Sequence, residues 1–375
     1  MIPIKHVPLG LLLVLPVLLI CSRCESSHHE VDEDMVRGIA WDYPGDEGID
    51  GHPSVVFADN FETGDLHDLR ERWGHWNNRD EKVMSFSSEV PEGSAGLRSL
   101  KMTATRGENA GGELYKTFDP GWDKIYLRFY TKFAEDHGIY HHFVALRGFK
   151  DPLPYPMGGA GRRAENHFSV TIEPSTAEIN RYPNIMHEPP GVWQFYAYWP
   201  EMRSWQTPEG EPDGRDNPYY GNSFQPQEPS VVPRGEWISV EIMVKVNSTP
   251  EEKDGEMALW IDGVPAVHFA PGTPKGYWKS SDRFPGDPAI PNARFRNDPD
   301  HPDAEPFEGF RWRHDMDVKV NVLRLQHYIS EGTFRNTQAY SEENPDRPIN
   351  TEQNIVWFDN VVMATEYIGP MRAVD

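Results

Sequence analysis

The clearest strand pattern in the sequence lies at Trp237–Asn247, which reads WISVEIMVKVN. From Ile238 to Val246 every second residue is a branched apolar one, and Ser239, Glu241 and Lys245 lie between them. Successive side chains of a β-strand point to opposite faces, so this alternation predicts an antiparallel strand with one buried face. The segment therefore has one side directed at a core and one side directed outward.

The chain then turns back on itself. Glu256–Ile261 reads EMALWI and Val264–Phe269 reads VPAVHF, with Asp262-Gly263 between them. Asp-Gly readily adopts the positive φ angles of a tight hairpin turn. The two segments are therefore predicted to be paired neighbours of the first strand.

Similar short segments recur on both sides, and no segment shows a sustained 3.6-residue apolar period. The other predicted strands are Ser99–Thr105, Gly112–Phe118, Lys124–Ala134, His141–Phe149, His167–Glu173, Val192–Trp199, Val318–Ile329 and Asn354–Ile368. About ten strands without helices predict an all-β, two-sheet antiparallel sandwich of the jelly-roll type. Long Pro/Gly-rich insertions lie between the strands at 150–166, 200–234 and 270–313, and we expect them to wall a binding cleft.

The first 54 residues differ in composition from the rest. Residues 1–24 hold a short apolar run with Lys5 ahead of it, which predicts a secretory signal peptide; a membrane anchor is the alternative. Residues 25–54 are acidic and predicted to be a disordered tether, and residues 55–370 form the folded domain. Both cysteines lie in the signal region, so we expect no disulfide in the mature protein. We also expect a monomer that is secreted or periplasmic, or that is held at the cell surface by a lipid on Cys21.

The charge balance limits the partners. With 36 Lys and Arg against 59 Asp and Glu, the net charge is −23. Such a field repels nucleic acids and anionic membranes. A local basic groove still attracts an anionic sugar within about 10 Å.

The outward faces of three predicted strands carry aromatic, imidazole and cationic side chains, which suit a sugar chain because rings stack on sugars and cations pair with carboxylates. We expect these faces to line one shared trough. The candidates for substrate binding in it are Tyr126, Arg128, Tyr130, Lys132, His167, Ser169, Gln194 and, in 318–329, Gln326. In 318–329 the alternation slips between Val322 and Leu323, which predicts a bulge and leaves open whether Gln326 or His327 points outward. Ordinary solvated faces are the alternative for all of them.

Three groups of residues resemble concanavalin-A-like jelly rolls: Val56–Glu62, the region from Arg234 to Gly263, and Trp357–Val362. Within that superfamily their order is similar to polysaccharide lyases of family fourteen, which cleave polyuronates. The resemblance covers most of residues 55–368. It implies a jelly-roll fold and β-elimination on a uronate-containing polysaccharide.

The resemblance also implies site residues. The family's Tyr-x-Tyr pair is matched by Tyr196 and Tyr198, and its catalytic lysine falls near His142. Its Ser-x-Arg pair is matched at best by Ser169 with Thr171, so Arg147, Arg128 or Arg163 has to replace the missing arginine. β-Elimination needs a cation to neutralise the carboxylate, a base for the C5 proton and an acid for the leaving oxygen.

We therefore expect catalysis by His142, Arg147, Tyr196 and Tyr198, with no cofactor required. The alternative is a non-catalytic carbohydrate-binding protein, since the family's lysine and arginine are missing. A glycoside hydrolase is a further alternative, although the strands lack a Glu-x-Asp-x-x-Glu pattern. A structural Ca²⁺ is expected if Asp59, Glu62 and Asp359 meet where the first and last strands pair.

Overall fold

The computed structural model describes residues 37–151, 164–176, 185–202, 221–226, 228–279 and 304–374. All of them belong to one compact unit, Val36–Asp375. The predicted signal peptide, Cys21 and Arg163 lie outside the described residues.

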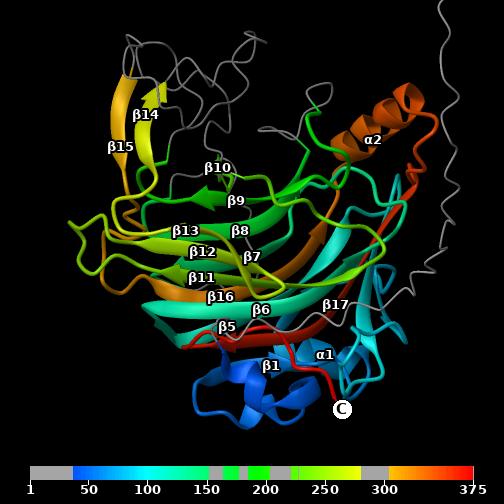
Figure 1. Ribbon diagram of the computed structural model, residues 1–375, viewed down its shortest axis with the longest axis horizontal. Helices are drawn as coiled ribbons and strands as arrows, with labels where there is room; N and C mark the ends of the chain where they lie inside the picture. The colour runs from blue at the N-terminus through cyan, green and yellow to red at the C-terminus, as the bar shows by residue number, and fades with distance from the viewer. Residues whose placement is uncertain are drawn as a thin grey trace, which may run out of the picture. The chain divides into compact units, whose positions relative to one another are not determined.

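Two antiparallel sheets form the body of this unit (Figure 1). The eight-stranded sheet has the order β13-β12-β11-β6-β17-β4-β3, and β1 pairs with β17. Its strands are β13 (Val264–Phe269), β12 (Glu256–Ile261), β11 (Trp237–Lys245), β6 (Lys124–Phe133), β17 (Gln353–Ala364), β4 (Ser99–Thr105), β3 (Met84–Ser87) and β1 (Val55–Asp59).

The seven-stranded sheet has the order β10-β9-β8-β7-β16-β5-β2. Its strands are β10 (Asn222–Phe224), β9 (Val192–Tyr198), β8 (His167–Ser175), β7 (Val144–Phe149), β16 (Lys319–Tyr328), β5 (Gly111–Trp122) and β2 (His75–Asn77). A separate pair joins β14 (Lys275–Lys279) and β15 (Ala304–Glu308). The predicted all-β antiparallel sandwich is confirmed.

The core lies between the inner faces of the two sheets. The alternating residues of β11 all belong to it, as do Phe129 of β6, Val170 of β8 and Trp193 of β9. Each large apolar side chain buried in this way contributes about 2–3 kcal/mol. Because the side chains alternate, the polar residues of β7, β8 and β9 are left on the outer face of the seven-stranded sheet.

The predicted hairpin is also confirmed. β12 pairs with β13, and the turn residues Asp262 and Gly263 have φ angles of 50° and 79°. The predicted strand β11, however, is buried on both sides, since Ser239 and Glu241 are each 2% exposed. Something other than the second sheet therefore covers its outer face.

That cover comes from the two ends of the described chain. Residues 37–51 form three 3₁₀ turns, η1 (Ile39–Asp42), η2 (Pro44–Asp46) and η3 (Ile49–Gly51), and Ile39 and Ala40 donate backbone hydrogen bonds to the closing segment at Tyr367 and Ile368. A small apolar cluster joins Ile39 and Ile49 to Val362 and Ile368. The folded region therefore begins before Val55, because residues 37–54, predicted to be a tether, bury apolar side chains of their own.

The expectation of a fold without helices is wrong. Helix α1 (Leu66–Trp73) starts at Asp65, whose side chain accepts from the backbone of His67 and Asp68, and α2 (Glu331–Glu343) starts at Ser330 in the same manner. Such caps satisfy the orphan N–H groups of a helix start. Among the described residues no helix has the length and apolarity that crossing a membrane requires.

Candidate functional site

The outer face of the seven-stranded sheet gathers most of the predicted site residues. Strand register places Tyr198 of β9 opposite Ser169 of β8, and Ser169 opposite Arg147 of β7. One step along, Tyr196 lies opposite Thr171, which lies opposite Ala145. The residues near the centre of this face are small, and the larger side chains stand around them.

Tyr196 and Tyr198 form the middle of the candidate site. Their hydroxyl oxygens lie 3.2 Å apart, and Tyr196 Oη also accepts a hydrogen bond of 3.0 Å from the backbone N–H of Gly221. The ring of His142 stacks on Tyr196 with a centroid distance of 5.3 Å. The predicted tyrosine pair and the predicted histidine therefore lie together.

A buried carboxylate orients His142. His142 Nδ1 lies 2.9 Å from Glu173 Oε2, and Gln194 Nε2 donates to Glu173 Oε1 at 3.2 Å. The His142 side chain is 31% exposed, whereas that of Glu173 is 2% exposed. With Nδ1 held by the carboxylate, Nε2 of a neutral imidazole is left as the proton acceptor.

Arg147 brings a buried cation to the same face. It is 2% exposed, and its guanidinium lies over the Phe149 ring at 4.8 Å. Burial lowers the pKa of Arg147 to about 10, and the neighbouring Arg324 cation adds to this effect, while Tyr115, Glu113 and Tyr198 oppose it. A negative charge arriving beside Arg147 would relieve the unfavourable proximity of the two arginines.

On the other side of Arg147, the face continues through β16 and β5. Glu113 Oε2 accepts from Arg324 Nε at 2.5 Å and from Gln326 Nε2 at 3.1 Å. Gln326 therefore points outward. His327 points into the core, where its Nδ1 lies 2.6 Å from Tyr140 Oη. The predicted bulge exists, but the register shift lies between Val320 and Val322.

His167 marks the far end of this face. Its ring stacks on Phe149 at 5.4 Å with only 9° between the planes. The face therefore carries every predicted catalytic residue and four of the predicted binding residues: His142, Arg147, Tyr196, Tyr198, His167, Ser169, Gln194 and Gln326.

The four candidates on β6 lie elsewhere. Tyr126, Arg128, Tyr130 and Lys132 belong to the eight-stranded sheet, which shares no strand with the face just described. Arg128 is fully buried in an ion pair with Asp46 of the opening segment, at 2.5 Å. Tyr130 Oη accepts from the backbone of Met371, and Lys132 pairs with Glu89 at 2.6 Å. The expectation that the β6 residues line the same trough as the tyrosine pair is wrong, because β6 faces the other way.

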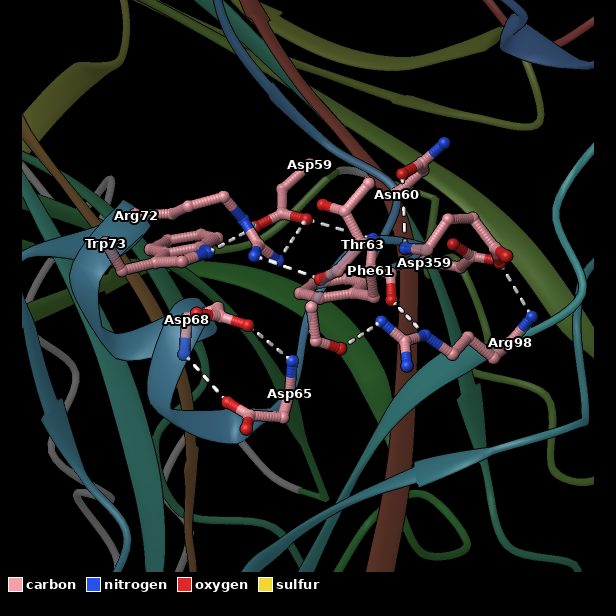
Figure 2. A network of polar contacts seen from close by, with 12 residues as sticks. Asp59, Asn60, Phe61, Thr63, Asp65, Asp68, Arg72, Trp73, Arg98 and Asp359 are labelled. Carbon is pink, nitrogen blue, oxygen red and sulfur yellow. Dashed lines mark hydrogen bonds and ion pairs between the residues drawn. The ribbon is translucent and has the colours of Figure 1, made fainter.

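The residues expected to bind calcium lie near the pairing of β1 with β17, where Figure 2 shows Asp59 and Asp359, but their three carboxylates do not gather into one group. Asp59 is already satisfied: its oxygens accept from Arg72, from Trp73 Nε1 at 2.8 Å and from the backbone of Phe61. Among the described residues, the side-chain ligands close enough to form a group of three are instead His67, Asp68 and Glu71, all exposed on α1.

Asp359 fits a cation better than Asp59 does. Its Oδ2 is buried without a hydrogen-bond partner, and burial, together with the charges of Glu62 and Asp46, raises its pKa to about 8. Glu62 Oε1 accepts from the backbone of Leu97 and Arg98. Two carboxylates, Asp359 and Glu62, are thus suited to oxygen-seeking Ca²⁺, and Asp59 is not.

Several residues of this face were not among the predicted site residues. Glu173 stood alone in its strand, and only the fold brings His142 to it. Tyr115, Arg324 and Tyr328 lie on strands where the alternation was uncertain or short. Gly221 lies in a Pro/Gly-rich insertion without periodicity, so no local signal pointed to its contact with Tyr196.

Neither a known family model nor a curated protein sequence matches the chain. The chain does match solved structures of alginate lyases. A marine PL-14 alginate lyase from Aplysia kurodai is 13% identical with a TM-score of 0.49, covering 83% of this chain and 99% of that one. An alginate lyase from a Chlorella virus is 11% identical with a TM-score of 0.45, covering 83% and 99%. An endo-β-1,4-glucuronan lyase from Trichoderma reesei is 15% identical with a TM-score of 0.40, covering 83% and 96%.

Proposed function

We propose that the protein is a secreted polysaccharide lyase that cleaves a uronate-containing polymer by β-elimination on the outer face of the seven-stranded sheet. The observation that carries this proposal is the meeting of four chemically suited side chains. The hydroxyls of Tyr196 and Tyr198 lie 3.2 Å apart and the His142 ring stacks on the Tyr196 ring, while Arg147 lies on the same face, one strand beyond Ser169 from Tyr198.

Each group matches one demand of the reaction. Arg147 neutralises the uronate carboxylate, which makes the C5 proton easier to remove. A tyrosine oxygen takes that proton, the electrons of the C–H bond form the C4=C5 double bond, and the C4–O bond breaks. The tyrosine that acts as base is deprotonated, and the other hydroxyl of the pair gives its proton to the leaving oxygen; His142 gives it instead where its Nε2 first took the proton of that base. Glu173 keeps His142 in one orientation.

The same geometry disfavours hydrolysis. On the described part of this face, the carboxylates Glu173 on β8 and Glu113 on β5 are separated by β7 and β16. At about 4.8 Å per strand their backbones lie roughly 14 Å apart, beyond the ~5–10 Å of hydrolase carboxylate pairs. Each is also occupied, Glu173 by His142 and Glu113 by Arg324.

The test is turnover of defined polymers. The protein is incubated with alginate, glucuronan and a neutral glucan, and the absorbance of the unsaturated uronate is followed. We expect absorbance to grow with a polyuronate and not with the neutral glucan. Tyr198→Phe and His142→Gln should each lower the rate about a hundredfold or more. Tyr130→Phe removes a hydroxyl from the other sheet and should leave the rate of the folded protein unchanged.

Other results contradict the proposal in distinguishable ways. Retention on a polymer gel without new absorbance identifies a carbohydrate-binding protein without catalysis. New reducing ends without absorbance identify a hydrolase. A rate that falls as far in Tyr130→Phe as in Tyr198→Phe shows that the reaction does not take place on the proposed face.

A further inference from the structure

The contact between Gly221 and the tyrosine pair is specific to glycine. A Cβ atom added at residue 221 would lie 2.8 Å from Tyr196 Cζ, 2.8 Å from Tyr198 Cε2 and 2.9 Å from the carbonyl oxygen of Ala197. Such distances are too short for any real side chain. Only a bare backbone therefore comes close enough for the N–H of Gly221 to reach Tyr196 Oη at 3.0 Å.

This N–H adds a donor at one end of the tyrosine pair, and Arg147 adds positive charge at the other. If the pair holds one proton, a phenolate on Tyr196 accepts from both Gly221 and the hydroxyl of Tyr198. A phenolate on Tyr198 accepts from the hydroxyl of Tyr196 and interacts with Arg147. Donors and cations directed at the charged form favour that form.

Burial acts in the opposite direction. Tyr196 and Tyr198 are 8% and 6% exposed, and burial disfavours a phenolate. Two buried hydroxyls that touch cannot both ionise, for the same reason that two neighbouring carboxylates cannot. The pair therefore loses its first and second protons at widely different pH values.

We propose that the Gly221 N–H and Arg147 together make Tyr196 and Tyr198 a pair that shares one proton, losing its first proton at a lower pH than the other tyrosines of the protein. Gly221 is then a positioning residue that acts through Tyr196. The role in catalysis rests on the proposed lyase function: one oxygen takes the C5 proton while the pair gives its own proton to the leaving oxygen. The pair ends the reaction with one proton, as it began, so no external acid or base is consumed.

The test does not need turnover. Phenolate absorbance of the full chain is recorded against pH for the unmodified protein, Tyr196→Phe, Tyr198→Phe and, as a control on the other sheet, Tyr130→Phe. We expect one phenolate to appear at least about one pH unit below the rest, a tenfold difference in the equilibrium. It should be missing in both variants of the pair and present in Tyr130→Phe.

Gly221→Ala tests the contribution of the backbone N–H. Displacing the N–H should move the early phenolate to higher pH while the later tyrosines titrate as before. The proposal is overturned if the early component persists in either Phe variant, or if no early component exists in the unmodified protein. Should Gly221→Ala fail to fold, the two Phe variants still show whether the early phenolate belongs to the tyrosine pair. An early phenolate in a protein that cleaves no polyuronate would refute the lyase function and leave the proton-sharing pair intact.

Discussion

The outer faces of the two sheets carry similar side chains, but the ends of the chain cover only the face of the eight-stranded sheet. On β6 the outward residues Tyr126, Arg128, Tyr130 and Lys132 mix rings with cations, as do Tyr196, Tyr198 and Arg147 on β9 and β7. The eight-stranded face is covered by the ends of the chain: Asp46 pairs with Arg128, and Ile368 and Gly369 donate to Glu241 at 2.8 Å each. On the seven-stranded face the polar groups contact each other, and the His142 side chain remains 31% exposed.

A tyrosine-arginine pattern on a strand therefore does not by itself indicate a binding surface. What separates the two faces is which other parts of the chain pack against them. On the closed face a buried arginine serves the fold, and on the other we assign one to the substrate.

Removing each buried arginine in turn should have the largest effects, and different ones on the two faces. Arg128→Met leaves Asp46 buried without its partner and should destabilise the protein by about 3–5 kcal/mol while the folded fraction keeps its activity. Arg147→Met should lower the polyuronate cleavage rate by roughly 10²–10³-fold through loss of the cation. Urea unfolding and turnover per folded molecule measure the two effects, and an exchange of the two outcomes would place the site on the wrong sheet.

The strands of the sandwich were predictable because their alternation is local: β11, β12 and β13 follow directly from Ile238 to Phe269. The helices were not. In α2 the buried positions include Thr333 and Thr337 beside Phe334 and Tyr340, so no apolar stripe appears in the sequence. The cap residues Asp65 and Ser330 are as common in turns as at helix starts.

The site was predictable only in part, because many of its contacts join residues that are far apart in the sequence. The pairing of Arg128 with Asp46 spans 82 positions, and that of Ser54 with Glu366 spans 312. Nothing in the alternation of β6 reports which segment will cover it. Tyr196 and Tyr198 were predicted from the resemblance to the lyase family, and Arg147 as a replacement for that family's arginine. Glu173, Arg324 and Gly221 are recognisable only from contacts between strands.

Calcium gives the second test, on the closed face. We propose that Asp359 and Glu62 hold a structural Ca²⁺ near the pairing of β1 with β17, since Asp359 Oδ2 is buried without a hydrogen-bond partner. At a hundredfold excess over its dissociation constant the ion contributes about 2.7 kcal/mol, raising the Tm by roughly 5 °C. Asp359→Asn should abolish the rise. A Tm that changes with neither Ca²⁺ nor chelator would contradict the calcium site. Lyase activity should not depend directly on the ion.

A third test concerns the core between the two faces. His137 stacks on Tyr140 at 5.2 Å, and burial, together with nearby His327, lowers the pKa of His137 to about 3. In the unfolded chain a histidine has a pKa of about 6.5. Below that pH the unfolded state binds a proton that buried His137 does not, so the free energy of unfolding falls as the pH falls toward 3. At pH 5 the loss is about 2 kcal/mol.

His137→Phe removes this dependence and keeps the stacking on Tyr140. The variant should therefore gain about 2 kcal/mol relative to the unmodified protein between pH 7 and pH 5, measured by urea unfolding at both values. Comparing the two proteins at each pH cancels the opposite contribution of Glu241, whose pKa burial raises to about 7. A constant difference between them would mean that His137 is not held neutral.

The smallest effect is expected at Lys132, the most exposed of the cations first assigned to substrate binding on β6. Its partner Glu89 is 46% exposed, and exposed ion pairs contribute less than about 1 kcal/mol. Lys132→Ala should therefore change stability by no more than that amount and leave the KM for a polyuronate unchanged, because Lys132 lies on the sheet that the substrate does not reach. A rise in KM without loss of stability would mean that the polymer also contacts the outer face of the eight-stranded sheet. The substrate site would then not be confined to the seven-stranded sheet.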